Sequence, residues 1–367
     1  MDRTGELKKS LSKYFDFNKA RLDCLARILL SLFAVRTVNL KQIALGFASK
    51  SVIDSRYRRL QRFFAQFKWD YSVLARWLFY GFFDSNQKVY LIVDRTNWFW
   101  GKSKINILML SVAYEGLAIP LFWQMLNKAG NATAKEHSEI IERYVKLFGK
   151  ENILGVLGDR EFASGALFNF FSTQDIPFYI RIKGNACITV GRQKVFTAEK
   201  VFSHLNSKDT AVFGAAVMIY GRKVYLSGSR SERGELMIIA TLKPCKNAIP
   251  IYLRRWEIEN LFQGLKSRGF QFEDTHLTHP ERISTLIAVV SVAFCWAHKI
   301  GEFKALTKPI IFKYFRHQQR PQYSYFHYGL DHLREILLNP LKRLYRHFRP
   351  VLRLLTLPLS KVKLCPI

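Results

Sequence analysis

Three acidic residues stand where they could do chemistry on a phosphodiester. Asp94 and Asp159 each end an apolar run typical of a buried strand, residues 88–94 and 153–159, and Glu259 lies on a later helix. Carboxylates that are brought together repel one another unless a cation neutralises them, and Mg²⁺ prefers oxygen ligands. In a basic protein this set indicates metal-assisted phosphoryl transfer on nucleic acid. For either aspartate alone, a solvated strand end is the ordinary interpretation.

The third acid belongs to a stripe of polar residues on its helix. Apolar spacing predicts a helix over residues 250–268, with Pro250 in its first turn and Gly269 as its terminator. At about 100° per residue, one face of a continuous helix carries four polar residues: Tyr252, Arg255, Glu259 and Lys266. On periodicity alone, an ordinary amphipathic helix with an Arg255–Glu259 ion pair is the favoured interpretation.

The motifs of the central region resemble those of the IS4 family of insertion-sequence transposases. The segment YLRRWEIENLFQGLKSRGF, residues 252–270, has the family spacing Y-(2)-R-(3)-E-(6)-K. The runs VDRTNW (residues 93–98), GDREF (residues 158–162) and FEDTHLTHPERI (residues 272–283) also look like that family. The resemblance covers about residues 87–300 and implies an RNase H-like catalytic core of the DDE type.

The resemblance also implies roles for individual residues. The catalytic residues and metal ligands would be Asp94, Asp159 and Glu259, and the residues that contact DNA near the scissile phosphate would be Tyr252, Arg255 and Lys266. Two Mg²⁺ ions, for which Mn²⁺ could substitute, would lie about 3.5–4 Å apart and activate an attacking water or 3′-hydroxyl. Arg255 and Lys266 suit phosphate neutralisation, whereas packing at the helix start is an equally good role for Tyr252.

One feature of the family, a Trp that stacks a flipped base, has no counterpart in this sequence. Members of the family can excise their element through a DNA hairpin and stack a flipped base on a Trp in the β insertion. Here residues 160–255 contain no Trp. Any aromatic face can stack a base, and the candidates are Phe196, Phe202, Phe213, Tyr220 and Tyr225. The hairpin route therefore stays open, and Trp98 is interpreted as a packing residue.

The chain is strongly basic, and its charge is uneven. Its 57 Lys and Arg oppose 28 Asp and Glu, for a net charge of +29. Residues 1–86 carry 16 basic and 7 acidic side chains, and residues 301–367 carry 13 and 3. A hydrophobic content of 49% excludes a disordered chain. The composition indicates a globular protein whose two ends grip a polyanion.

The N-terminal segment is predicted to be helical. A short helix at residues 40–47, a break at residues 48–51 and a basic helix at residues 52–67 are compatible with a helix-turn-helix DNA reader. The candidate DNA-binding side chains on the basic helix are Arg56, Arg58, Arg59 and Arg62. An arginine-rich solvated helix explains the pattern equally well.

The predicted fold is α/β, an RNase H-like mixed sheet that is interrupted by a β-rich insertion and flanked by helical ends. Three regions are expected: a DNA-end-binding domain at residues 1–86, a catalytic domain at residues 87–300 with its insertion at about 184–245, and a basic helical region at residues 301–367 for dimerisation and DNA contact. The long apolar run at residues 286–297 is interpreted as a buried helix, because a membrane span needs about 20 residues.

Several functional classes are excluded by missing features. The five cysteines are scattered and form no CxxC pair, which argues against a disulfide framework or a zinc site and for a reducing compartment. The N-terminus has no apolar signal segment, and no phosphate-binding Gly-rich loop is present. We therefore expect a cytoplasmic protein of the bacterial nucleoid, with no membrane partner and no nucleotide cofactor.

The combined prediction is a cut-and-paste DNA transposase. It would bind the terminal inverted repeats of its element as a homodimer in a paired-end complex, cleave double-stranded DNA and join the ends to target DNA. A metal-dependent nuclease without joining activity is the enzymatic alternative. A DNA-binding inhibitor of transposition is the non-enzymatic one, against which the intact acid set argues.

Overall fold

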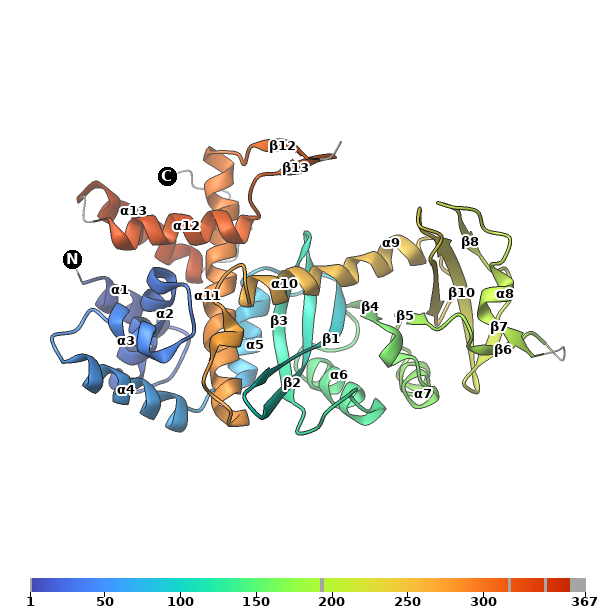
Figure 1. Ribbon diagram of the computed structural model, residues 1–367, viewed down its shortest axis with the longest axis horizontal. Coiled ribbons are helices and arrows are strands. Elements are labelled where there is room, and N and C mark those ends of the chain that lie inside the picture. The colour runs from blue at the N-terminus through green and yellow to red at the C-terminus, as the bar shows by residue number, and fades with distance from the viewer. Residues whose placement is uncertain (1, 192–194, 316–317, 340–341, 357–367) are drawn as a thin grey trace. The chain divides into compact units, whose positions relative to one another are not determined.

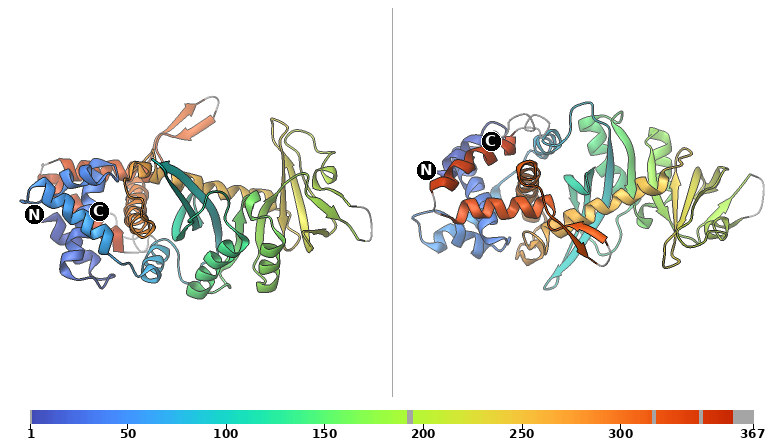
Figure 2. Two further views of the ribbon diagram at one scale, coloured as in Figure 1. Left: turned by 60° about the horizontal axis from the view of Figure 1, so that its bottom comes forward. Right: turned by 90° about the horizontal axis from the view of Figure 1, so that it is seen from above.

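The computed structural model describes residues 2–191, 195–315, 318–339 and 342–356 (Figures 1 and 2). The chain forms two compact units. Unit 1 consists of Met1–Ser85, Trp98–Ile105 and Phe262–Ile367, and unit 2 consists of Asn86–Asn97 and Asn106–Leu261. Of the predicted regions, part of the β insertion (192–194) and parts of the C-terminal region (316–317, 340–341 and 357–367) lie outside the described residues.

A mixed sheet of 11 described strands forms the framework of unit 2. One half has the order β3-β2-β1-β4-β5, made of β1 (Val89–Trp100), β2 (Ser103–Tyr114), β3 (Leu117–Met125), β4 (Ile153–Gly158) and β5 (Phe178–Ile182). β2 and β3 pair antiparallel, whereas β4 pairs parallel with both β1 and β5. Together with the flanking helices, this mixed sheet confirms the predicted fold class.

Local sequence explains the elements that surround this half of the sheet. Nearly every residue of β2 is buried, as expected for a strand that is covered on both faces. The β2–β3 turn is Glu115-Gly116, where both residues have positive φ, a conformation that suits glycine. Helix α6 (Ala134–Phe148) begins with a capping box between Thr133 and Glu136, and it packs against β3 and α7 (Gly165–Gln174).

The predicted β insertion continues the same sheet. Its elements are β6 (Cys187–Thr189), β7 (Phe196–Thr197), α8 (Ala198–Val201), β8 (Thr210–Val212), β9 (Val217–Ile219), β10 (Arg222–Arg230) and β11 (Leu236–Thr241). Strand β11 pairs antiparallel with β5, so the insertion extends the core sheet through its backbone hydrogen bonds.

The helix predicted over residues 250–268 is interrupted. It consists of α9 (Ala248–Leu253), a 3₁₀ turn at Arg254–Trp256 and α10 (Glu257–Leu265). A 3₁₀ turn has 3.0 residues per turn instead of 3.6, so the single stripe expected for a continuous helix is wrong across this turn. The helical segment also ends at Leu265, four residues before the expected terminator Gly269.

Unit 1 is helical and is built around one apolar helix, α11 (Pro280–Thr307). Around it pack α2 (Lys19–Val35), α4 (Ile53–Gln66), α5 (Tyr71–Tyr80), α12 (Tyr325–Leu338) and α13 (Lys342–Thr356). Unit 1 also contains α1 (Arg3–Leu11), α3 (Leu40–Gly46) and the hairpin β12 (Phe312–Phe315)–β13 (Gln318–Pro321). Helix α11 is long and apolar enough to span a membrane, but its most apolar stretch is 94% buried inside the structure, as is typical of a core helix.

Two predicted region boundaries can be placed on these elements. The boundary at residues 86/87 falls between α5 and β1, in the loop that leads into the sheet. The boundary at residue 300 falls inside α11, which continues to Thr307. The division into three functional regions stays a prediction. The compact units divide the chain differently, because unit 1 contains residues from both ends of the chain.

The contact between α11 and α12 depends on two glycines. A Cβ atom added at Gly329 would overlap the backbone of Ala297, and one added at Gly301 would overlap the backbone of Tyr325. Because backbone cannot move aside as a side chain can, we expect Gly329→Ala to lower the free energy of unfolding by about 3 kcal/mol. Urea unfolding would measure this. Gly214→Ala, which meets no atom within 4 Å, is the control, and equal losses in both variants would contradict the close packing.

Candidate active site

Two of the predicted acids are brought together by the pairing of β1 and β4. The strands are parallel, and Ile92 pairs with Leu157, so Asp94 and Asp159 each follow two residues later at the same edge. Each carboxylate accepts a hydrogen bond from the next backbone amide, at 2.7 Å for Arg95 and 2.6 Å for Arg160. The expected strand end at Asp94 is wrong: β1 continues to Trp100 and passes beyond β4, so Asp94 becomes accessible where its neighbour strand stops.

The third acid is linked to the first by an arginine. Arg255 donates through Nη1 to Asp94 Oδ2 at 2.7 Å and through Nη2 to Glu259 Oε1 at 2.8 Å. The guanidinium is buried, whereas the Glu259 side chain is half exposed. The ordinary i,i+4 ion pair is therefore real, and the same arginine also reaches the acid on β1. Arg255 thus holds two of the three predicted catalytic carboxylates in one place.

The environment of Asp94 disfavours its charge. Burial raises the pKa of Asp94 to about 6, and the Glu161 and Asp159 carboxylates add to this, while Arg255 and the Arg95 amide oppose it. Burial also disfavours the charge of Arg255, but the carboxylates of Asp94 and Glu259 help to keep the pKa of Arg255 above its ordinary value. The Arg255 guanidinium therefore offsets part of the cost of burying the Asp94 charge.

The three predicted ligands fit a metal ion by their chemistry, although an arginine separates two of them. All three are carboxylates, which suit a hard divalent cation. Among the residues that the structure describes, no three His, Cys, Asp or Glu side chains are close enough together to hold one ion. The positive charge between Asp94 and Glu259 is the Arg255 guanidinium. A metal held by both carboxylates would therefore compete with Arg255 for their oxygens.

A network that the sequence did not reveal supports this edge of the sheet. Arg95 Nη2 donates to Glu161 Oε2 at 2.9 Å, and the same guanidinium reaches the side chains of Asn106 and Asn131 at 3.0 Å. His137, which is buried, lies 3.9 Å from Glu161. Glu161 therefore forms a salt bridge with Arg95. The sequence held one indication of this contact. Arg95 directly follows Asp94, and Glu161 lies two residues after Asp159, so strands that bring the two aspartates together also bring Arg95 near Glu161.

Tyr252 and Lys266 have different surroundings. Tyr252 is 2% exposed and packs with Ile239, Ala248 and Ile249, so the packing role is present and its contact with DNA stays a prediction. Burial raises the pKa of Tyr252. Lys266 belongs to unit 1, where it pairs with Glu273 at 2.7 Å and lies 5.5 Å from the centre of the Trp98 ring.

Trp98 has the packing role that was expected. Its side chain is buried and meets the Phe272 ring edge-on at 5.0 Å. In the β insertion, Phe202 is buried, whereas Tyr220 is 42% exposed at the positive-φ turn between β9 and β10. Among the five aromatic candidates for base stacking, Tyr220 is thus the most accessible one, and its role stays a prediction.

The four arginines predicted to bind DNA fall into two pairs. Arg56 donates to the backbone carbonyls of Phe47, Ser49 and Ser51 and so closes the turn between α3 and α4. Arg59 pairs with Asp23 of α2 at 2.9 Å. Arg58 and Arg62 are exposed on α4. Arg56 therefore stabilises the α3–α4 turn and Arg59 links α4 to α2, whereas contact of Arg58 and Arg62 with DNA stays a prediction.

The raised pKa of Asp94 predicts a pH dependence of stability. As pH rises from 3.8 to about 6, folded Asp94 keeps a proton that the unfolded chain has lost, so the wild type loses stability relative to Asp94→Asn, by about 3 kcal/mol in total. Urea unfolding with EDTA between about pH 3 and 7.5 would measure this, because that range covers the pKa windows of both Asp94 and Glu161. Glu161, whose pKa is lowered, is the matched control: relative to Glu161→Gln, the wild type loses stability as pH falls. A pH-independent difference for Asp94→Asn would contradict the assignment.

Comparison with known proteins identifies the family of the chain. A family model described as "Transposase DDE domain" matches residues 85–296, which is more than half of the chain. Among solved structures, the chain is similar to a piggyBac transposase in a cryo-EM synaptic complex with hairpin DNA, with 11% identity, a TM-score of 0.42, and coverage of 92% of this chain and 77% of that chain. A likeness at that level carries no argument about function. No curated protein matches the chain. The family match shows that the chain belongs to the transposase DDE domain family, whose members are enzymes that act on DNA.

Proposed function

We propose that this protein is a cut-and-paste transposase of the IS4 family. The observation that supports this most is the meeting of Asp94 and Asp159 at one edge of a mixed sheet, with Arg255 joining Asp94 to Glu259. The chain also has the Y-(2)-R-(3)-E-(6)-K spacing that resembles the family, and two residues of this motif, Arg255 and Glu259, belong to the ion-paired cluster at Asp94. The proposed reaction is endonucleolytic cleavage at the element ends, followed by strand transfer to target DNA.

Different residues of the chain have different proposed roles in this reaction. Asp94, Asp159 and Glu259 would hold divalent metal, which supplies activation of the attacking oxygen and stabilisation of the leaving oxygen; Mg²⁺ is the proposed ion, two per site, with Mn²⁺ as a substitute. Arg255, once released from the carboxylates, would pair with a phosphate through its planar fork. Arg95 is held by Glu161 and keeps the backbone amide that bonds Asp94 in place.

The proposed partners are double-stranded DNA at the inverted repeats and at the target, and a second copy of the chain. Arg58 and Arg62 on α4 and the basic residues of the C-terminal helices would supply phosphate contacts. Each contact should add about −0.9 to the slope of log affinity against log salt. The proposed location is the cytoplasm of a bacterium, in association with the nucleoid.

A strand-transfer assay tests this proposal against its alternatives. The DNA that flanks the gene is searched for short inverted repeats, and pre-cut duplexes with those ends are incubated with the protein, Mg²⁺ and a target plasmid. A transposase joins the 3′-hydroxyl ends to the plasmid. Cleavage of uncut ends without joining would identify a nuclease, and binding without either reaction would identify a regulator.

A further inference from the structure

The tip of the β1–β2 hairpin presents aromatic rings next to positive charge. Trp98–Ile105 is part of unit 1, and the tip turns tightly at Gly101, whose φ is +55°. Phe99 is 65% exposed and Trp100 36% exposed. The ammonium of Lys104 lies 5.3 Å from the centre of the Phe99 ring. Successive side chains of a strand point to opposite faces, so Phe99, beside Lys104, and Trp100 expose aromatic surface on the two faces of the tip. Exposed aromatic rings next to positive charge are the arrangement that stacks nucleic-acid bases.

The tip is anchored beside a polar cavity of the same unit. Trp100 stacks on His276 with ring centres 4.3 Å apart and an angle of 24° between the planes. His276 also faces the side chain of Asn39 at 3.5 Å. Both His276 and Asn39 line a cavity of about 160 Å³, together with Leu40, Lys41, Tyr57, Gln61, Leu277 and Arg282. One side chain, His276, therefore belongs to both the aromatic tip and the cavity.

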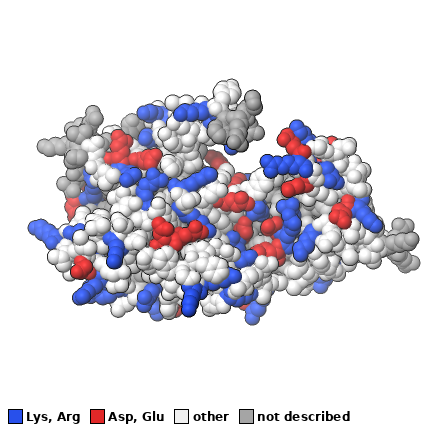
Figure 3. Space-filling view, viewed as in Figure 1, with Lys and Arg blue, Asp and Glu red and all other residues white. Residues whose placement is uncertain are grey.

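The lining of this cavity suits a phosphate. Two of its side chains, Lys41 and Arg282, are exposed cations, and no Asp or Glu of the described residues lines it. Tyr57, Gln61 and Asn39 add hydrogen-bonding groups. Lys and Arg are spread over the face seen in Figure 3, so positive charge alone does not single out this place. The combination of this positive charge with the stacked rings of Trp100 and His276 does single out this place.

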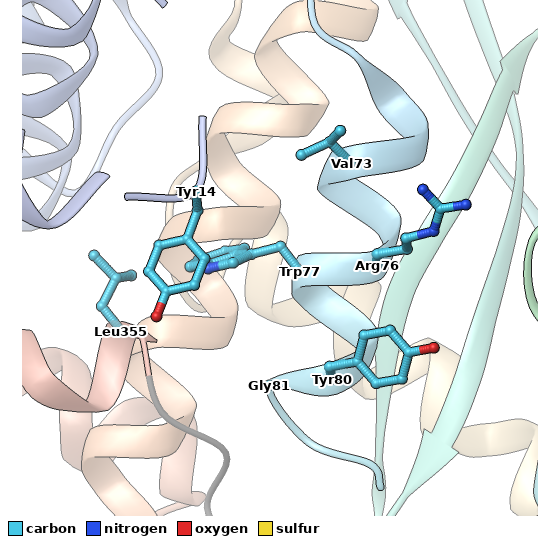
Figure 4. A pocket seen from close by; sticks show the side chains of 7 residues that line it. All are labelled: Tyr14, Val73, Arg76, Trp77, Tyr80, Gly81 and Leu355. Carbon is cyan, nitrogen blue, oxygen red and sulfur yellow. The ribbon is translucent and has the colours of Figure 1, made fainter. Parts of the chain in front are cut away.

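A second cavity of unit 1 provides the contrast. It has a volume of about 400 Å³ and is lined by Tyr14, Val73, Arg76, Trp77, Tyr80, Gly81 and Leu355. In Figure 4 the Arg76 guanidinium points away from Trp77 and Leu355, which leaves an apolar interior. This lining contains one charged residue, Arg76, whereas the polar cavity has two cations and several hydrogen-bonding side chains. The polar cavity is therefore the better match for a phosphate.

We propose that the Phe99–Trp100 tip and the adjacent cavity form a DNA subsite, in which unstacked bases lie on the exposed aromatic surface of the tip and a phosphate of the same strand lies at Lys41 and Arg282. This inference rests on the proposed function, because it assigns another contact to the same DNA partner. The subsite contains none of the predicted catalytic or DNA-binding residues. It is built from α3, α4, the hairpin tip and the segment around the start of α11.

Affinity for single-stranded DNA tests the stacking half of the subsite. The probe is a fluorescent 20-nucleotide thymidine oligomer, and its dissociation constant is measured by anisotropy for the full-length protein. Phe99→Ala combined with Trp100→Ala should weaken binding about 10- to 100-fold, since the variant has no ring at the tip on which a base can stack. Phe99→Trp should retain wild-type affinity. Tyr80→Ala, which removes an exposed aromatic residue beside the apolar cavity, should leave affinity unchanged. Because Trp100 contacts His276, Phe99→Ala alone serves as the variant with no packing change.

The salt dependence of the same binding tests the phosphate half. Lys41→Gln combined with Arg282→Gln should reduce the slope of log affinity against log salt by about 1.4 for single strands. Wild-type affinity and slope in all of these variants would overturn the subsite. If the wild type cleaves element ends while the Phe99 and Trp100 variants bind as it does, the subsite alone is wrong. If the wild type neither binds nor cleaves DNA, the proposed function fails with it.

Discussion

The Asp94→Asn variant is expected to cleave element-end DNA at least 1,000-fold more slowly than the wild type, which corresponds to about 4 kcal/mol of activation free energy. Asparagine keeps the shape of the side chain but removes the charge that would hold a divalent cation, and a bound cation contributes several kcal/mol to such reactions. Asp159→Asn and Glu259→Gln should show losses of the same size. Single-turnover cleavage of an end-labelled duplex with Mg²⁺ would measure all three.

A matched control lies on the same helix as the third acid. Glu257 is buried and pairs with Arg254 at 3.0 Å instead of with the site. Glu257→Gln should therefore cleave within a few-fold of the wild type, and DNA binding should persist in every variant. Equal cleavage by Asp94→Asn and the wild type would show that the site assignment is wrong, as would a loss in Glu257→Gln that exceeds the loss in Glu259→Gln.

The Arg255→Ala variant is expected to lose about 3 kcal/mol of unfolding free energy in EDTA at pH 8. Removing one member of a buried ion pair leaves the other charge uncompensated, and here the charge left behind is that of Asp94. Arg255→Lys should lose less, because the ammonium keeps a charge but cannot fork between two carboxylates. Urea unfolding gives the free energies, and the exposed Lys135–Glu139 ion pair provides a control, since Lys135→Ala should cost less than about 1 kcal/mol.

Divalent metal should act differently on the wild type and on Arg255→Ala. In the wild type a cation held by both carboxylates would compete with the guanidinium for the oxygens of Asp94 and Glu259. In the alanine variant it is absent, so Mg²⁺ should restore stability at lower concentration than is needed to stabilise the wild type further. Thermal unfolding over a series of Mg²⁺ concentrations would show this. Identical Mg²⁺ dependence in the two proteins would contradict the assignment of Arg255 as the cation that the metal replaces.

The sequence was most informative where a pattern is local or where spacing carries chemistry. The apolar runs before Asp94 and Asp159 predicted the two strands that carry these acids, and the structure pairs these strands in parallel. The apolar run within α11 predicted a buried helix, which the structure confirms. These features depend on a few consecutive residues, and local propensity and burial therefore determine them.

The sequence was least informative where distant residues decide a side chain's partner. The helix expected over residues 250–268 contains a 3₁₀ turn, and β1 runs on past Asp94. Arg56 and Arg59 were expected on a DNA-facing helix, yet they bond the α3–α4 turn and Asp23. A charged side chain takes whichever opposite charge or carbonyl the fold places within reach, and helical periodicity holds no information about that choice.

The sequence by itself thus determined the acid set, the mixed α/β class and the basic character of the chain. Tertiary structure alone decided that Arg255 occupies the space between Asp94 and Glu259, and that Trp100 stacks on His276 beside a polar cavity. The Arg255–Asp94 and Trp100–His276 contacts each join residues that are far apart in the chain. Such pairs are set by strand register and helix packing, which many residues determine together, and no local spacing encodes them.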